Sequence, residues 1–80
     1  MEEVGRVTHF FNKISVAVVE LNGTLKVGDN IRIKGKNTDF EQTVESMQIE
    51  HKPVEEAGPG DSIGLKVKER VREGDIVYKL

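Results

Sequence analysis

The stretch "EAGPGDSIGL" (Glu56–Leu65) contains one of three Gly-Asp pairs in this 80-residue chain. The pairs are Gly28-Asp29, Gly60-Asp61 and Gly74-Asp75, and each precedes an apolar run: "NIRI", "SIGL" or "IVYK". Glycine permits the positive φ that many tight turns need, and the following aspartate can hydrogen-bond the backbone of the turn. We interpret the pairs as turns that open β-strands. A calcium cage would need six to eight oxygens with close local spacing, which the sequence lacks.

β-strand signals dominate the rest of the chain. Segments rich in β-branched and aromatic residues, or with alternating apolar and polar residues, predict six strands and no helix. The strands are Val4–Phe11, Ile14–Leu21, Asn30–Gly35, Phe40–Glu50, Ser62–Lys68 and Ile76–Leu80. The apolar phase of the fourth strand shifts near Glu45–Ser46, which indicates a β-bulge there. His51–Gly60, with two prolines, is predicted to be a loop.

An all-β chain of this length must protect its strand edges, and closure into a barrel removes them. We therefore predict one domain over residues 1–80, a small closed antiparallel barrel of six strands, with fraying at residues 1–3 and 80.

Composition limits the classes of function. There is no cysteine, and the net charge of −2 argues against indiscriminate binding to polyanions. The acidic first residues do not form a signal peptide, and the longest apolar run, Val16–Val19, is too short to cross a membrane. We expect a soluble cytoplasmic protein. The high content of Glu and Lys is typical of hyperthermophile proteins.

Motifs for catalysis and cofactor binding are absent. His9 and His51 lie on different segments without zinc-site spacing, and no nucleophile motif is present. The chain has no P-loop, and "NKIS" (Asn12–Ser15) lacks the carboxylate that would read guanine. We expect no enzyme activity, metal, cofactor or bound nucleotide.

Basic residues give two candidate surfaces. Lys66, Lys68, Arg70 and Arg72 are all even-numbered and would form a stripe on one face of an extended chain. Such a stripe can track RNA phosphates, or its members can pair with acids across strands. Arg32 and Lys34 are expected to point outward and to pair with Glu41 and Glu45.

Phe10 and Phe11 are adjacent and must point to opposite faces of a strand. One is expected to enter the core. The other either contacts a partner or is covered by a loop.

Four segments resemble the second domain of translational GTPases, the family that includes the factors delivering aminoacyl-tRNA. They are "GRV" (Gly5–Val7), "LKVGDNIRIKG" (Leu25–Gly35), "VESMQIEHKPVEEAGPGDSIGLKVK" (Val44–Lys68) and "REGDIVYK" (Arg72–Lys79). The resemblance implies a six-stranded Greek-key barrel, here standing alone. In the family this domain helps to hold the acceptor end of tRNA or the small ribosomal subunit.

The resemblance, with the basic stripe, predicts a module that binds tRNA, ribosomal RNA or a ribosomal protein. The stripe and the segment Gln48–Glu56, with Gln48, His51 and Lys52, would carry this binding. The alternative is a protein-interaction module or small homo-oligomer that uses Phe10 or Phe11. The long first hairpin of this chain resembles the one in the accessory, non-catalytic barrels at the end of some U32-type peptidases. A monomer or a weak homo-oligomer is expected.

Overall fold

The computed structural model describes all residues, Met1–Leu80, as ten β-strands without a helix. The strands are β1 (Glu2–Phe11), β2 (Val16–Leu21), β3 (Leu25–Lys26), β4 (Asn30–Lys34), β5 (Asp39–Thr43), β6 (Met47–Ile49), β7 (Lys52–Val54), β8 (Glu56–Ala57), β9 (Ser62–Lys66) and β10 (Ile76–Lys79). The all-β prediction is confirmed. The structure contains no helix with the length and apolar character needed to cross a bilayer.

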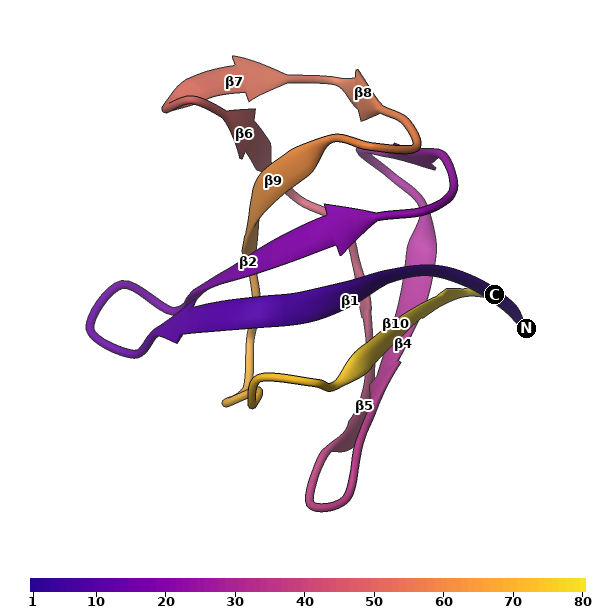
Figure 1. The fold of residues 1–80 in the computed structure, drawn as a ribbon, viewed down its shortest axis with the longest axis vertical. Helices are drawn as coiled ribbons and strands as arrows, with labels where there is room; N and C mark the ends of the chain where they lie inside the picture. Colours follow the sequence, from indigo (N-terminus) through magenta and orange to yellow (C-terminus); the bar gives the residue numbers. More distant parts are fainter.

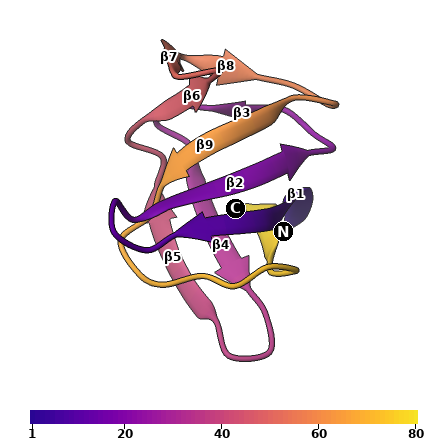
Figure 2. The same cartoon turned by 60° about the vertical axis from the view of Figure 1, so that its left-hand side comes forward.

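Eight strands form one curved antiparallel sheet in the order β5-β4-β10-β1-β2-β9-β6-β7. β3 and β8 pair separately, at the end of the molecule where β6 and β7 lie (Figures 1 and 2). The two chain ends lie side by side, because Glu2 on β1 pairs with Lys79 on β10. The hairpins β1–β2 and β4–β5 project from the body of the molecule (Figure 1).

The predicted closed barrel of six strands is wrong in two respects. The strands are ten, and the hydrogen-bond ladder is open because its edge strands, β5 and β7, do not pair with each other. The edges are protected by other means. Pro53 lies on the edge strand β7, where a missing N–H does no harm to the sheet. Along β5, the side chain of Gln42 takes the place of a backbone ladder, with hydrogen bonds to Lys66 and Lys68.

The prediction of a single bulged strand over Phe40–Glu50 is also wrong. β5 ends at Thr43 and β6 begins at Met47, so the apolar phase shifts because the chain changes its position in the sheet between them. The predicted loop His51–Gly60 instead contains β7 and β8. Both are three residues or shorter, and Pro53 and the neighbouring glutamates conceal the strand pattern.

A core of 17 apolar residues fills the inside of the curved sheet. It follows from alternation along the strands: Ile31 and Ile33 on β4, and Ile63 and Leu65 on β9, are all at most 1% exposed. Val67, just after β9, continues the same inward phase at 2% exposed. Alternation with a period of two residues therefore accounts for these core positions.

The three Gly-Asp pairs form one repeated turn, as predicted. Gly28, Gly60 and Gly74 have φ of 97°, 89° and 93°. In each turn the aspartate carboxylate accepts the backbone N–H of the residue three positions earlier, at 2.8–2.9 Å. The aspartate N–H donates back to the carbonyl of that same residue. The aspartates are therefore structural and lie in three separate turns.

Candidate functional site

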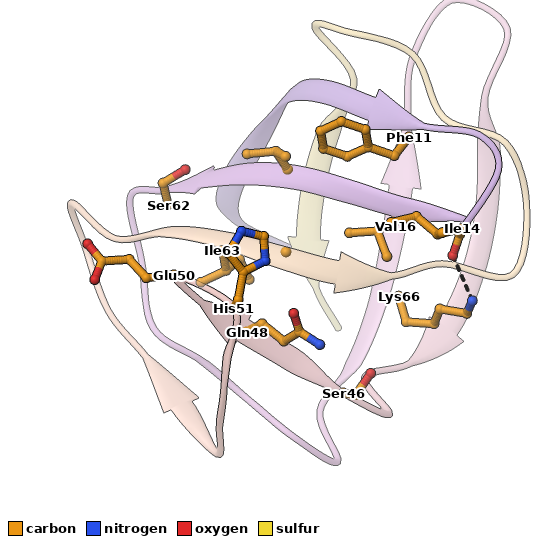
Figure 3. A pocket seen from close by; sticks show the side chains of 12 residues that line it. Phe11, Ile14, Val16, Ser46, Gln48, Glu50, His51, Ser62, Ile63 and Lys66 are labelled. Atoms are coloured by element: carbon orange, nitrogen blue, oxygen red, sulfur yellow. Dashed lines mark hydrogen bonds between the residues drawn. The ribbon is translucent and has the colours of Figure 1, made fainter.

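The outer face of β2, β9 and β6 carries an open groove of about 500 Å³ (Figure 3). Its floor is apolar, formed by Val16 and Val18 of β2 and by Gly64 of β9. Phe11 and Ile14 of the β1–β2 hairpin form one wall. The rim is polar and consists of Ser46, Gln48, Glu50, His51, Ser62 and Lys66.

The floor is a consequence of strand alternation and register. Ala17 and Val19 of β2 point into the core and are fully buried, so Val16 and Val18 must point outward. Gly64 lies between the strands, paired with Val18 on one side and with Gln48 on the other. Because Gly64 has no side chain, the face is lowest at this position.

The wall contains two of the most exposed large apolar side chains in the chain. Phe11 is 47% exposed and Ile14 is 57% exposed. Phe10 points the other way and packs against the core, which confirms that the two phenylalanines lie on opposite faces. The ring of His9 contacts Phe11 edge-on, with 4.4 Å between the ring centroids. No loop covers Phe11, so this apolar wall is open to a ligand.

Lys66 closes one end of the groove. Its Nζ donates a hydrogen bond of 2.7 Å to the carbonyl oxygen of Ile14, which ties the β1–β2 hairpin to β9 (Figure 3). The only lysine that lines the groove is thus already bound to the protein itself.

The opposite end is formed by the two-residue turn between β6 and β7. Ile49 pairs with Lys52, so Glu50 and His51 make up the turn, and their φ values are 51° and 65°. Positive φ at both central residues defines a type I′ hairpin. The imidazole of His51 lies over β9, above Gln48 and beside Ile63 (Figure 3).

The predicted RNA-binding residues divide into separate locations. Gln48, His51 and Lys66 line the groove, and Lys52 is exposed on β7. The predicted alternation of the basic stripe ends early, because β9 stops at Lys66. Lys68, Arg70 and Arg72 follow in irregular chain; they are exposed and form no ion pair. Arg70 and Arg72 line a second hollow of about 340 Å³ with Phe10 and Glu73.

The prediction that Arg32 points outward and binds an acid is correct, but its partner differs from the expected ones. Arg32 donates from Nε and from its terminal nitrogen to the two carboxylate oxygens of Asp39, at 2.7 and 2.8 Å. This hydrogen bond, assisted by the opposite charge, lowers the pKa of Asp39 and raises that of Arg32. Neither residue lines the groove.

The structure brings no group of three or more His, Cys, Asp or Glu side chains close enough together to hold a metal ion. The groove offers apolar contact and hydrogen bonds, which is the chemistry of a binding site.

Sequence reasoning missed the floor of the groove. The run Val16–Val19 contained the signal, since four consecutive apolar residues on a strand must place two of them on the outer face. Ile14 and Gly64 line the groove together because the β1–β2 hairpin packs beside β9. The local sequence does not encode this packing.

Comparisons with known proteins place this chain in a family. The family described as "Elongation factor Tu domain 2" matches residues 15–78. Elongation factor 1-alpha of Archaeoglobus fulgidus is 37% identical over 59 residues, which cover 69% of this chain and 14% of that protein.

Peptidase-like proteins are similar over nearly the whole chain. An uncharacterized protease of Methanocaldococcus jannaschii is 53% identical over 79 residues, covering 98% of this chain and 19% of that protein. A collagenase of Porphyromonas gingivalis is 38% identical over 78 residues, covering 95% of this chain and 22% of that protein. The chain thus spans about a fifth of the length of these two relatives.

A solved structure has the same fold. It is the C-terminal domain of a Geobacillus thermoleovorans protein assigned as a U32 peptidase, with a TM-score of 0.93 and 22% identity. The match covers 99% of this chain and 92% of that one. With the family match over residues 15–78, these findings confirm the barrel type expected from the sequence, and the chain belongs to the elongation factor Tu domain 2 family.

Proposed function

We propose that this chain is a non-catalytic binding barrel, accessory to peptidase-type chemistry, and that its groove holds an extended polypeptide segment. The observation that carries the proposal is the groove itself: an uncovered apolar floor and wall, Val16, Val18, Phe11 and Ile14, with hydrogen-bonding side chains around it.

The relatives support the accessory role. The protease and the collagenase described above match nearly all of this chain, and both are about five times longer than the matched segment. The fold matches a C-terminal domain assigned to a U32 peptidase. Proteins of both kinds act on polypeptides, so an attached barrel that holds a polypeptide fits their chemistry.

The chemistry of the groove supports a polypeptide over a phosphodiester chain. Apolar side chains of a peptide can occupy the floor around Gly64, and Gln48, Ser46 and Ser62 can hydrogen-bond its backbone. Phosphate binding depends on free cationic groups. The lysine of the groove, Lys66, instead donates to Ile14, and Glu50 adds a negative charge to the rim.

The proposal is tested by NMR titration of the ¹⁵N-labelled chain with short blocked peptides that contain a Leu-Val-Leu run, against a Gly-Ser peptide of equal length. We expect the apolar peptides to shift the amides of Val16, Val18 and Gly64 in a saturable manner, and the Gly-Ser peptide to leave them unchanged. Absence of saturable shifts at these amides at millimolar peptide would refute the groove as a peptide site. A fluorescent casein substrate incubated with the chain should remain intact.

RNA binding is a second candidate, favoured by the likeness to elongation factor 1-alpha and by the exposed, unpaired side chains of Lys68, Arg70 and Arg72. Titration with tRNA at several salt concentrations tests it, because phosphate contacts weaken as salt rises. Salt-dependent shifts at Lys68–Arg72, lost on charge reversal of Lys68, would establish it. If tRNA gives no shifts at low salt, this candidate is withdrawn.

A further inference from the structure

Backbone strain in this chain is concentrated around the groove. Three non-glycine residues have positive φ: Ser15 at 54°, Glu50 at 51° and His51 at 65°. Glu50 and His51 line the groove, and Ser15 lies between two further lining residues, Ile14 and Val16. Left-handed backbone is unfavourable for residues that have a Cβ, and the residues that adopt it occur preferentially at functional sites.

The chain uses glycine wherever the turn is purely structural. Gly28, Gly60 and Gly74 occupy the positive-φ positions of the three Gly-Asp turns. A two-residue type I′ hairpin strongly favours the sequence Asn-Gly, because both of its central residues have positive φ. The β6–β7 turn instead has Glu50 and His51. The turn therefore retains two unfavourable residues whose side chains lie at the groove. This indicates that the side chains, and not the turn geometry, determine these two positions.

The charge at this end of the groove is negative. Glu50 forms no ion pair, and Glu20 lies on the outward face of β2, in phase with Val16 and Val18. Glu20 pairs in register with Ser62, and Ser62 lies on the same side of the groove as Glu50 (Figure 3).

The positive groups near the groove do not offset this charge. Lys66 stands at the other end and binds Ile14, as described above. Lys52 follows the turn on β7, pairs with the inward residue Ile49 and does not line the groove. The groove is thus apolar in its middle and acidic at the end formed by Glu50 and Glu20.

We propose that the Glu50–His51 turn and Glu20 form a specificity element that selects a polypeptide segment with a basic side chain beside an apolar run. This inference rests on the proposed function, since the apolar run would occupy the floor at Val16, Val18 and Gly64. The basic side chain lies against the two carboxylates, and His51 packs over the ligand where it crosses β9.

The test compares two blocked peptides, one with a lysine two positions before a Leu-Val-Leu run and the other with glutamate in place of that lysine. Wild-type protein is expected to bind the lysine peptide more tightly than the glutamate peptide. The expected gain in affinity is about threefold to fivefold for each carboxylate that the lysine contacts, which is the contribution of one exposed ion pair. The double variant Glu20→Gln, Glu50→Gln should lose this preference and retain the apolar contact. Glu69→Gln, an exposed glutamate away from the groove, is the matched control and should keep the preference.

A second variant separates recognition from folding. Glu50→Asn with His51→Gly installs the favoured type I′ turn, so its thermal midpoint should rise while its affinity for the lysine peptide falls. If the two residues serve stability and not recognition, the midpoint should fall and the affinity for the lysine peptide should stay unchanged.

The outcomes distinguish this inference from the proposed function. If both peptides shift the groove amides equally in every variant, the specificity element is refuted and the polypeptide site stands. If neither peptide shifts them, both are refuted. If a short oligoadenylate shifts these amides at lower concentration than either peptide, the ligand is a nucleic acid and the inference is overturned.

Discussion

The side-chain Oε1 of Gln42 on β5 accepts a hydrogen bond of 2.9 Å from the backbone N–H of Lys68. The Nε2 atom of the same side chain donates to the carbonyl oxygen of Lys66, also at 2.9 Å. One amide therefore makes both kinds of hydrogen bond that a neighbouring strand would make. It joins the edge of the sheet to the end of β9, where the groove ends at Lys66.

Replacing Gln42 by leucine should destabilise the fold by about 1–3 kcal/mol, because two backbone groups lose their partners. Gln42→Glu should cost less, since a carboxylate still accepts from Lys68 but cannot donate to Lys66. Urea unfolding followed by circular dichroism measures both. Gln48→Ala, at an exposed residue without such bonds, is the control and should change stability by less than about 0.5 kcal/mol. Equal stability of the leucine variant and the wild type would show that the contact between β5 and the end of β9 does not depend on Gln42.

Gly35→Ala should destabilise the protein by about 2 kcal/mol or more. A Cβ on Gly35 would overlap the carboxylate of Asp75, which is 4% exposed and accepts the N–H of Arg72 at 2.8 Å. The thermal midpoint reports the loss. Gly58→Ala is the control, because a Cβ there meets no atom within 4 Å and the residue does not have positive φ. Similar midpoints for the two variants would contradict the close approach of Gly35 to Asp75.

Replacing Arg32 by methionine should raise the pKa of Asp39 toward its ordinary value of 3.8, since the hydrogen bond from Arg32 is the main cause of the lowered pKa. A carboxyl whose pKa is lower in the folded state stabilises the fold above its unfolded pKa. This contribution to stability is lost as the pH falls through the pKa of the carboxyl in the folded state. The stability difference between wild type and variant should therefore be constant above about pH 5 and shrink below it. NMR titration of the Asp39 carboxyl carbon, with unfolding curves at several pH values, tests both parts; an unchanged Asp39 pKa in the variant would refute the assignment.

Gly64→Ala should separate stability from binding. The added Cβ would lie 3.4 Å from Val16 Cγ1, an ordinary contact, and it would raise the lowest point of the groove floor. Alanine is favoured over glycine within a strand by about 0.5–1 kcal/mol, so the thermal midpoint should rise. Binding of the Leu-Val-Leu peptides, followed by NMR, should weaken several-fold. Unchanged binding in a stable variant would place the peptide elsewhere.

Much of the fold was predictable because it depends on local pattern. The turn at Gly60-Asp61 combines a residue that tolerates positive φ with a side chain that caps it, and both features are visible in sequence. Alternation along Ser62–Lys68 likewise accounts for the burial of Ile63 and Leu65. The open ladder was not predictable. A strand pattern does not show which strand edges pair. It also does not show that the side chain of Gln42 joins β5 to the end of β9.

The candidate site was only partly predictable. The adjacent residues Phe10 and Phe11 were expected to diverge, and Phe11 does form the groove wall. Gln48, His51 and Lys66 were singled out for RNA binding, and the fold places them on the rim of one groove. The unusual turn at Glu50–His51 gave no local signal, because its positive φ contradicts what those residue types favour.

Local sequence pattern is enough to specify that this chain forms strands, where its three Gly-Asp turns lie and which side chains enter the core. These follow from steric preferences and from hydrophobic alternation, both of which act over a few residues. Val18, Gly64 and Gln48 lie side by side only in the folded chain, since they belong to three strands that pair across long separations in the sequence. Register between distant strands is set by packing of the whole core, and that packing forms the groove.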